Sequence, residues 1–343
     1  MKDARQAVVT FKPESAQAAR EELRETSPEL VFLETLSPGV ELWELPEGFA
    51  HLASRLAKLP PVFLQHIFPV HFTLETGNRP QDLEAVAELA PKLARLLTPG
   101  KSFSVQSRVL AENSPFQPFH FNQALSLPLI EAGFELDVKH PRQVVSLLAG
   151  EKQCRLGVSS PEENLSDWAG GRHRLARESG QISRAEFKLL EALKVFGLSL
   201  PAEGLALDLG AAPGGWSRIL LKNHLEVWAV DPAEMDARLS RHPQLKHCRE
   251  TVQLFLRRNL GIKFDLLVND LKLDALDSAG VVNRFHSWLN PEALVIMTLK
   301  LPESEQLKRV RAAREMLAQR YQVLGVKQLF HNRLEATVAL RRK

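Results

Sequence analysis

A glycine-rich segment that follows a short apolar run constrains this 343-residue chain most. Leu205–Leu209 has the length and character of a buried strand, and the segment from Gly210 to Gly215, GAAPGG, contains almost only small residues. Such a loop lets a ligand approach the backbone, and the following helix N-terminus offers free N–H groups. The pattern predicts a nucleotide-like ligand. A tight turn without a ligand would leave the Asp208 carboxylate at the strand end unexplained.

Spacing narrows the class of ligand. Asp231 ends the next apolar run, 21 residues after Gly210, where a carboxylate can accept hydrogen bonds from the ribose hydroxyls of an adenosine. The loop lacks the dinucleotide pattern G-x-G-x-x-G, and Pro213 has no N–H for a pyrophosphate. No Gly-Lys-Ser/Thr follows, which excludes a P-loop. These features favour S-adenosylmethionine (SAM) over NAD.

Regular alternation begins at Gln181 and predicts an α/β fold. Short apolar runs are separated there by helical segments, as in a doubly wound, Rossmann-like parallel sheet. The runs are Leu205–Leu209, Val227–Val230, Leu266–Val268 and Leu294–Leu299. Two more strands, Gln322–Leu329 and Ala336–Arg341, flank a polar turn and predict a terminal hairpin. We expect one domain over residues 181–343.

The first half of the chain predicts two smaller α+β modules, at residues 1–60 and 61–166. Pro60-Pro61 separates them. The second module is expected to begin with a strand around Phe63–Phe72 and to contain a helix over Gln81–Leu97, kinked at Pro91. Residues 167–180 predict a linker because Gly170-Gly171 precedes several basic residues. This linker reads as a solvated loop, or as a basic arm near a nucleic acid.

Composition argues against a highly basic nucleic-acid-binding protein, a cysteine-based metal protein and a membrane protein. The net charge of +3 is small, so any RNA-binding surface must be local. Cys154 and Cys248 lie far apart, without the spacing of a metal site, and we expect them to be reduced. No apolar stretch has the length of a signal peptide or a membrane span. We therefore expect a cytoplasmic protein that needs neither a membrane nor a metal.

Polar residues at the strand ends are candidates for chemistry, because ligands of such sheets lie across the carboxyl ends of the strands. Asp270 ends FDLLVND, and Lys300 follows an apolar strand in which Thr298 is the one polar residue. A snorkelling surface lysine is the alternative for Lys300. Lys188 and Glu335 could join the group, although the sequence supplies no distances.

The group would suit methyl transfer from SAM to a weakly acidic hydroxyl, which needs alignment and a base. Lys300 would serve as that base if its pKa fell by ~3 units. We expect partial burial and the like charge of Lys188 to lower this pKa. Asp270 would limit the depression, and Glu335 would hold a lysine in place.

Ser183 admits two roles. Ser183-x-x-Glu186 is a helix capping box, so the hydroxyl is expected mainly to cap the helix that follows. A hydroxyl at that position could also face the cofactor.

Several motifs together resemble the RrmJ/FtsJ group of SAM-dependent RNA 2′-O-methyltransferases. The motifs are SRAEFK, LDLGAAPGGWS, VND, LKLP and RLEATVAL. The resemblance implies a catalytic tetrad of Lys188, Asp270, Lys300 and Glu335. The candidate cofactor contacts are Ser183, Gly210, Ala212, Pro213, Gly214, Gly215, Trp216, Asp231, Thr251 and Asp270.

The order of the motifs is most similar to the RlmM-type 23S rRNA cytidine 2′-O-methyltransferases. This similarity implies ferredoxin-like and THUMP-like RNA-binding modules before the catalytic domain, and a chain that acts as a monomer on rRNA. Where that type carries R-E-D-G, this chain has Arg249-Glu250-Thr251-Val252, so Thr251 or Glu250 would contact the adenosine. Two alternatives stay open: a silent SAM- or RNA-binding assembly protein, and a 2′-O-methyltransferase of another RNA. A base N-methyltransferase lacks support, because its Asn/Asp-Pro-Pro-aromatic motif is missing at Asn269-Asp270.

Overall fold

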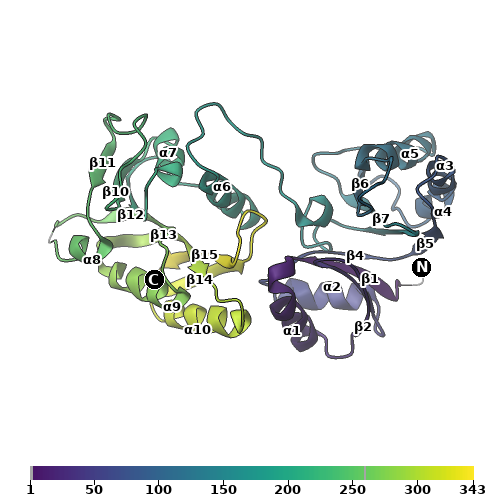
Figure 1. The fold of residues 1–343 in the computed structure, drawn as a ribbon, viewed down its shortest axis with the longest axis horizontal. Helices are drawn as coiled ribbons and strands as arrows, with labels where there is room; N and C mark the ends of the chain where they lie inside the picture. The colour runs from purple at the N-terminus through teal and green to yellow at the C-terminus, as the bar shows by residue number, and fades with distance from the viewer. Residues whose placement is uncertain (1–2, 259) are drawn as a thin grey trace. The chain divides into compact units, whose positions relative to one another are not determined.

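The computed structural model describes residues 3–258 and 260–343. The chain divides into two compact units, an N-terminal unit (residues 1–172) and a C-terminal unit (residues 173–343) (Figure 1). The division falls inside the segment 167–180 that the sequence marks as a linker. None of the helices in the described ranges is long and apolar enough to span a bilayer.

The N-terminal unit begins with a four-stranded antiparallel sheet. Its elements are β1 (Gln6–Phe11), the 3-10 turn η1 (Pro13–Ser15), α1 (Ala16–Thr26), β2 (Val31–Ser37), β3 (Val40–Glu44), α2 (Phe49–Lys58) and β4 (Leu64–Pro69). The strand order is β2-β3-β1-β4. Helices α1 and α2 cover one face (Figure 1), and their apolar residues Leu23, Leu52 and Leu56 are buried there.

A second four-stranded sheet follows in the same unit. Its elements are β5 (Phe72–Glu75), α3 (Gln81–Ala87), α4 (Ala90–Ala94), β6 (Phe103–Val109), α5 (Pro118–Glu131), β7 (Gln143–Ala149) and β8 (Gln153–Ser159). The order is β5-β8-β7-β6, with β6 and β7 parallel and the other neighbours antiparallel. The expected helix over Gln81–Leu97 is two helices, because Pro91 lies in the first turn of α4, where proline is tolerated.

The strand predicted around Phe63–Phe72 is in fact two strands in different sheets. β4 pairs with β1, whereas β5 pairs with β8. The change occurs at Val70, whose N–H donates to Gln6 O at 2.8 Å, and at His71, whose N–H donates to β8 at 2.8 Å. The apolar character continues across this point, which is why the pattern predicted a single strand. The first sheet therefore includes residues beyond position 60.

The start of the expected linker is folded onto the N-terminal unit. Ala169–Gly171 forms the 3-10 turn η2, which contacts β4 and β6, and Gln106 Nε2 donates to Asp167 O at 2.7 Å. Gly170 and Gly171 are buried, with φ of +62° and +67°. The interpretation as a solvated loop is wrong for this turn, because two residues without side chains let the backbone pack closely on the strands.

Replacing Gly171 by alanine should destabilise the N-terminal unit by about 1–3 kcal/mol. A Cβ at this position would lie 2.6 Å from the backbone oxygen of Gln65, in addition to the strain of a φ of +67°. Gly180→Ala is the matched control, since its φ is +79° but its Cβ would meet no atom closer than 3.7 Å. Urea denaturation measures both; equal losses in the two variants would contradict the close packing of η2.

The C-terminal unit contains a seven-stranded sheet. Its strands are β9 (Leu205–Leu209), β10 (Glu226–Val230), β11 (Leu245–Cys248), β12 (Phe264–Asn269), β13 (Leu289–Lys300), β14 (Tyr321–Lys327) and β15 (Glu335–Arg342). The order is β11-β10-β9-β12-β13-β15-β14; the first five strands are parallel, and β15 is antiparallel to both neighbours. The predicted parallel sheet and terminal hairpin are confirmed. Strand β11, which is short and mostly polar, was not predicted.

Helices cover both faces of this sheet, as expected for a doubly wound fold (Figure 1). They are α6 (Ala185–Val195), α7 (Gly215–Lys222), α8 (Val252–Phe255), α9 (Ala275–Arg284), η3 (His286–Trp288) and α10 (Gln306–Ala318). On one face, Leu189 of α6 and Leu220 of α7 share a core with Val227 and Leu266 of the sheet. Helices α9 and α10 lie on the other face. Because β9 to β13 are parallel, their carboxyl ends lie on one side of the sheet, here called its carboxyl edge.

Candidate active site

The glycine-rich loop joins β9 to α7. Gly210 and Gly214 have φ of +78° and +112°, a backbone region that favours glycine. A side chain at Gly215 would overlap the hydroxyl of Ser183, which comes from the segment before α6. Gly214 is the N-cap of α7, so the helix N-terminus follows the loop directly. The loop conformation thus requires the glycines from which the ligand site was predicted.

Ser183 does not cap α6, contrary to the prediction. The helix begins at Ala185 without a side-chain cap, and the Glu186 carboxylate accepts from Ile182 N at 2.7 Å and pairs with Arg218 at 2.6 Å. These contacts replace the reciprocal bonds of a capping box. Ser183 Oγ is buried and has no hydrogen-bond partner among the described residues. Its hydroxyl lies next to Gly215 of the loop.

Asp208, at the end of β9, is almost fully buried. Its Oδ2 accepts a hydrogen bond from Ser217 Oγ at 2.6 Å, which links the strand end to α7. Burial raises the pKa of Asp208 to about 7; the Ser217 hydroxyl opposes this shift, and the nearby Asp270 and Asp231 carboxylates add to it. The hydrogen bond between Asp208 and Ser217 thus joins the strand before the loop to the helix after it.

Asp231 follows β10 and holds the loop from the other side. Its Oδ2 accepts from Ala212 N at 3.1 Å, and its Oδ1 accepts from Ala233 N at 2.8 Å. Ala212 is joined to Pro213 by a cis peptide bond. The structure thus brings the carboxylate and the loop into direct contact. The hydrogen bonds from Asp231 to a ribose stay a prediction.

The other expected cofactor contacts have different surroundings. Trp216 is buried, and its indole N–H donates to Ala185 O at 2.7 Å, so its side chain packs α7 against α6. Thr251 is exposed, and its hydroxyl caps α8. Glu250, the alternative to Thr251, pairs with Arg258 at 2.7 Å. Both residues follow β11, the neighbour of β10 in the sheet.

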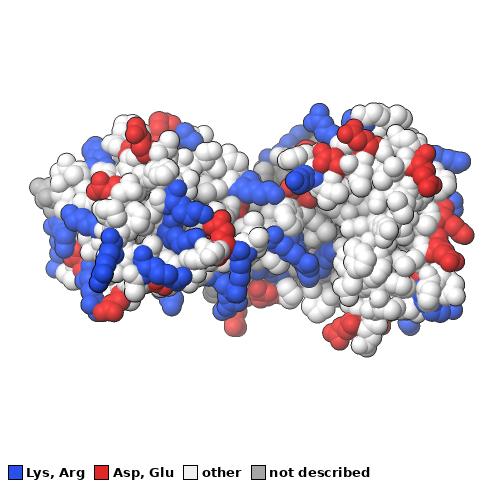
Figure 2. Space-filling view, turned by 90° about the horizontal axis from the view of Figure 1, so that it is seen from above, with Lys and Arg blue, Asp and Glu red and all other residues white. Residues whose placement is uncertain are grey.

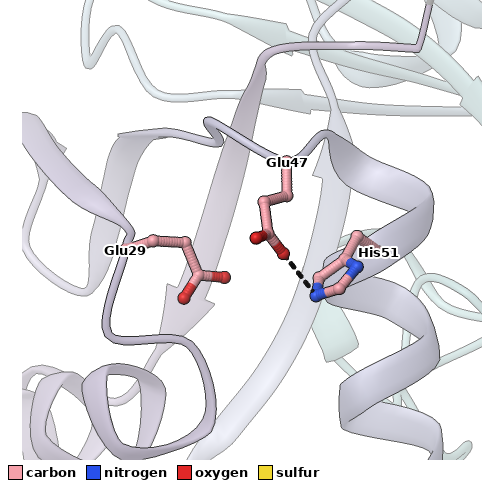
Figure 3. Close-up of side chains that lie close together, drawn as sticks. All are labelled: Glu29, Glu47 and His51. Carbon is pink, nitrogen blue, oxygen red and sulfur yellow. Dashed lines mark ion pairs between the residues drawn. The ribbon is translucent and has the colours of Figure 1, made fainter.

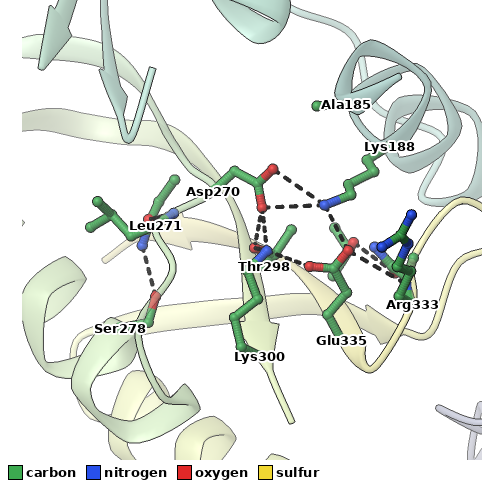
Figure 4. Close-up of polar contacts among 12 residues, drawn as sticks. Ala185, Lys188, Asp270, Leu271, Ser278, Thr298, Lys300, Arg333 and Glu335 are labelled. Atoms are coloured by element: carbon green, nitrogen blue, oxygen red, sulfur yellow. Dashed lines mark hydrogen bonds and ion pairs between the residues drawn. The ribbon is translucent and has the colours of Figure 1, made fainter. Parts of the chain in front are cut away.

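Two lysines and two carboxylates, the tetrad, meet at the carboxyl edge of the sheet (Figure 4). Lys188 comes from α6, Asp270 follows β12, Lys300 ends β13 and Glu335 begins β15. Lys188 Nζ lies 3.3 Å from Asp270 Oδ2 and 2.6 Å from Glu335 Oε1. Lys300 Nζ lies 2.6 Å from Asp270 Oδ1 and also pairs with Glu335, its direct neighbour across the two strands. Every charge contacts two charges of opposite sign.

The pKa of Lys300 shifts in the direction opposite to the one expected. Burial lowers this pKa, but the Asp270 and Glu335 carboxylates outweigh burial and raise it above its usual value of 10.5. The pKa of Asp270 is raised by burial, yet Lys300 and Lys188 bring it below its usual value. The prediction of a lowered pKa for Lys300 is wrong here, because two carboxylates at hydrogen-bond distance outweigh the effect of burial.

Comparison with known sequences shows what the C-terminal unit resembles. Residues 181–327 match the sequence profile of the FtsJ-like methyltransferase family. Over this range the C-terminal unit is similar to the FtsJ-like methyltransferases. The matched range contains the glycine-rich loop and Lys188, Asp270 and Lys300, while Glu335 lies just beyond it.

Relatives match over a longer stretch. The ribosomal RNA large subunit methyltransferase M of Laribacter hongkongensis is 33% identical over 207 residues, 54% of this chain and 55% of the relative. The protein of that name from Xylella fastidiosa is 32% identical over 64% of each chain, and the one from Pseudomonas aeruginosa is 29% identical over 65% of each. The chain thus spans between half and two thirds of the length of these relatives. Among solved structures, TrmN from Thermus thermophilus has a TM-score of 0.42 at 16% identity, covering 98% of this chain and 100% of that chain.

Thr298 is a member of the site that sequence reasoning did not assign to it. Its Oγ1 donates to Asp270 Oδ1 at 2.7 Å and accepts from Lys300 Nζ at 3.0 Å. The signal was present, since Thr298 is the one polar residue in an apolar strand, but its neighbours could not be read from the sequence. In the C-terminal unit it fixes the relative positions of a carboxylate and a lysine of the tetrad.

Glu191 is a second residue that the sequence did not reveal. Its buried carboxylate accepts from Phe330 N at 2.7 Å, from His331 N at 2.9 Å, and contacts His331 Nδ1 at 2.7 Å. The His331 ring packs on Phe187, with ring centroids 5.0 Å apart. Glu191 thereby anchors the segment that leads into β15 on α6, the helix that carries Lys188.

A separate group of potential metal ligands lies in the N-terminal unit (Figure 3). Glu47 and His51 pair at 2.6 Å, with Glu29 close to both. Glu29 also pairs with Arg55 at 3.3 Å, and both Glu47 and His51 are exposed. These contacts account for the group as surface ion pairs, and it adds nothing to the candidate active site.

Asp208→Asn should change how stability depends on pH. The pKa of Asp208 rises from 3.8 to about 7 on folding, so its protonation stabilises the fold fully below pH 3.8, and this stabilisation is lost as the pH rises to about 7. Asparagine does not titrate, and its amide oxygen can still accept from Ser217. The free energy of unfolding of the variant, minus that of the unmodified protein, should therefore rise by roughly 2–4 kcal/mol between those pH values. A difference that is constant in urea denaturation across this range would refute the assignment.

Glu191→Ala should release the segment before β15. The substitution leaves two backbone N–H groups without their acceptor, at a cost of about 2–4 kcal/mol. Hydrogen exchange at Phe330 and His331 should accelerate, while the core strand β9 keeps its protection. Glu292→Ala, which removes an exposed partner of Arg341 in the same unit, is the control. Unchanged exchange at both amides would rule out the anchoring role.

Proposed function

We propose that this chain is a SAM-dependent RNA 2′-O-methyltransferase that acts on a cytidine of 23S rRNA. The observation that carries the proposal is the tetrad of Lys188, Asp270, Lys300 and Glu335 beside the glycine-rich loop of an FtsJ-like domain. The names of the relatives, ribosomal RNA large subunit methyltransferase M, support the large-subunit substrate. An rRNA substrate also accords with a cytoplasmic protein, which we expect to act as a monomer.

The residues around the loop fit SAM as the cofactor. Ser183 Oγ is buried and unpartnered among the described residues, the glycine backbone leaves no side chain in the way, and Asp231 lies at the loop. Gly210 and Gly214 would admit the cofactor, Asp231 would accept hydrogen bonds from its ribose, and Thr251 or Glu250 would meet the adenosine. When bound, SAM would supply a methyl group from its sulfonium, and the neutral thioether S-adenosylhomocysteine would be the leaving group.

The tetrad would position a ribose hydroxyl and accept its proton at Lys300 Nζ. In the free protein the raised pKa of Lys300 keeps the amine protonated at neutral pH. Its neutral form is a strong but scarce base, so the reaction would draw on the small deprotonated fraction. Lys188 shares both carboxylates, and it would keep Asp270 and Glu335 in place when Lys300 loses its charge.

The N-terminal unit would bind the RNA. We assign its first sheet to a ferredoxin-like module and its second to a THUMP-like module, joined to the FtsJ-like domain by the linker 167–180. The strand–helix–strand–strand–helix–strand order of β1 to β4 supports the first assignment. The small net charge of the whole chain is compatible with RNA binding, because basic side chains can gather locally. Figure 2 shows such a gathering on one face of the C-terminal unit, which could therefore also contact the RNA.

One observation favours the alternative of a silent SAM- or RNA-binding assembly protein. All four tetrad charges are neutralised within the group, as in a purely structural ion-pair network. An assay for methyl transfer distinguishes the methyltransferase from the silent binding protein. Mapping the methylated nucleotide also tests the alternative of a different RNA substrate.

Purified protein, labelled SAM and 23S rRNA should yield a 2′-O-methylcytidine, and Lys300→Ala should slow its formation by about 10²–10⁴-fold. The substitution removes the proposed base without touching the glycine-rich loop, so SAM binding measured by calorimetry should persist. Lys263→Ala is the control, since this exposed lysine lies at the opposite end of β12 from Asp270. Label on a base, or full activity in Lys300→Ala, would overturn the proposal.

The pH dependence of the same assay tests the role of Lys300 directly. The raised pKa of Lys300 lies above the neutral range, so its neutral fraction increases roughly tenfold per pH unit there, and the rate of methyl transfer should increase with it. Glu335→Gln removes one stabilising carboxylate, so any remaining activity should follow a profile displaced to lower pH. SAM binding without transfer to any RNA would instead favour the silent protein.

A further inference from the structure

The tetrad presents no net positive charge to an RNA substrate. Its two lysines are matched by two carboxylates at hydrogen-bond distance. In RNA, the 2′-hydroxyl is on the carbon next to the one that bears the 3′-phosphodiester. Any 2′-oxygen presented to Lys300 therefore brings a phosphate into the immediate surroundings of Asp270 and Glu335. Cations outside the tetrad are needed to offset that repulsion.

Three cations flank the tetrad on the segments that supply it. Arg184 precedes Lys188 by four residues, Lys272 follows Asp270 by two, and Arg333 precedes Glu335 by two. All three flanking side chains are exposed, and none makes a hydrogen bond or ion pair within the described parts of the chain. Other cations of the unit, such as Arg218, Lys222 and Arg238, are paired with carboxylates.

Arg333 is the best fixed of the three. Figure 4 shows it beside Glu335 and Lys188, and its backbone N–H donates to Glu335 Oε1 at 3.5 Å. Its carbonyl accepts from Gln328 Nε2 at 3.0 Å, and the preceding residues are anchored by Glu191. The backbone of Arg333 is thus tied to the tetrad while its guanidinium is left without a protein partner. A guanidinium matches the geometry of a phosphate better than an ammonium does.

We infer that Arg333, together with Lys272 and Arg184, binds the RNA phosphates on either side of the target ribose. The inference rests on the proposed function, and it assigns these three cations as positioning residues. They contact the backbone of the substrate and not the reacting atoms. Their contribution should appear in RNA affinity and KM, with kcat changed far less than by Lys300→Ala.

The test uses the full chain and an unmodified 23S rRNA fragment, with binding measured at a series of salt concentrations in the absence of turnover. Arg333→Gln should weaken binding several-fold and reduce the slope of log K against log salt by about 0.7–0.9. Lys272→Gln and Arg184→Gln should act in the same direction. Arg333→Lys keeps the charge and should restore the slope but only part of the affinity. Lys263→Gln, at the far end of β12, is the matched control.

Binding by Arg333→Gln that matches Lys263→Gln in affinity and in slope would overturn the inference. A loss confined to kcat would also contradict it, as would an unmodified protein that does not bind the fragment. Failure of the proposed function has a different signature: the unmodified protein would bind RNA with the expected salt dependence and methylate nothing. Retained SAM affinity in each variant shows that the domain is folded.

Discussion

Ion pairing between alternating lysines and carboxylates holds together the carboxyl edge of the C-terminal unit. The tetrad joins α6, β12, β13 and β15, segments that are far apart in the chain. Such largely buried charges are tolerated because each has two partners; removing one leaves an uncompensated charge on the others. The same contacts that position the site also determine its proton affinity, so geometry and acidity at Lys300 cannot be altered independently.

Sheet topology makes this network possible. Parallel strands β9, β10, β12 and β13 end on the same side of the sheet, which places Asp231, Asp270 and Lys300 on that side. Asp270 and Lys300 lie on the adjacent strands β12 and β13. The last strand, β15, inserts between β13 and β14 in the opposite direction, so its first residue, Glu335, lies directly across from the last residue of β13. A single antiparallel strand thereby supplies the fourth charge to a site otherwise built from parallel ones.

The parts of this protein that were predictable from sequence depend on local signals. The glycine-rich loop, Asp231 and the apolar strands have patterns that local conformation dictates, and the structure has them where expected. The capping role of Ser183 was wrong because Ile182 and a distant arginine take up the Glu186 carboxylate. The predicted direction of the Lys300 pKa shift was also wrong, because it depends on how closely the Asp270 and Glu335 carboxylates approach. The anchoring role of Glu191 could not be predicted from the sequence, since its partners lie about 140 residues away in the chain.

Helix α6 carries Lys188 and Glu191 three residues apart, so one helical face serves both the tetrad and the anchor of the segment before β15. Insertion or deletion of a single residue between these positions would rotate one of them off that face. The segment between Phe330 and Glu335 is constrained in the same way, because both of its ends are held. We therefore expect length variation among related proteins to accumulate elsewhere on the domain surface and to spare these two stretches.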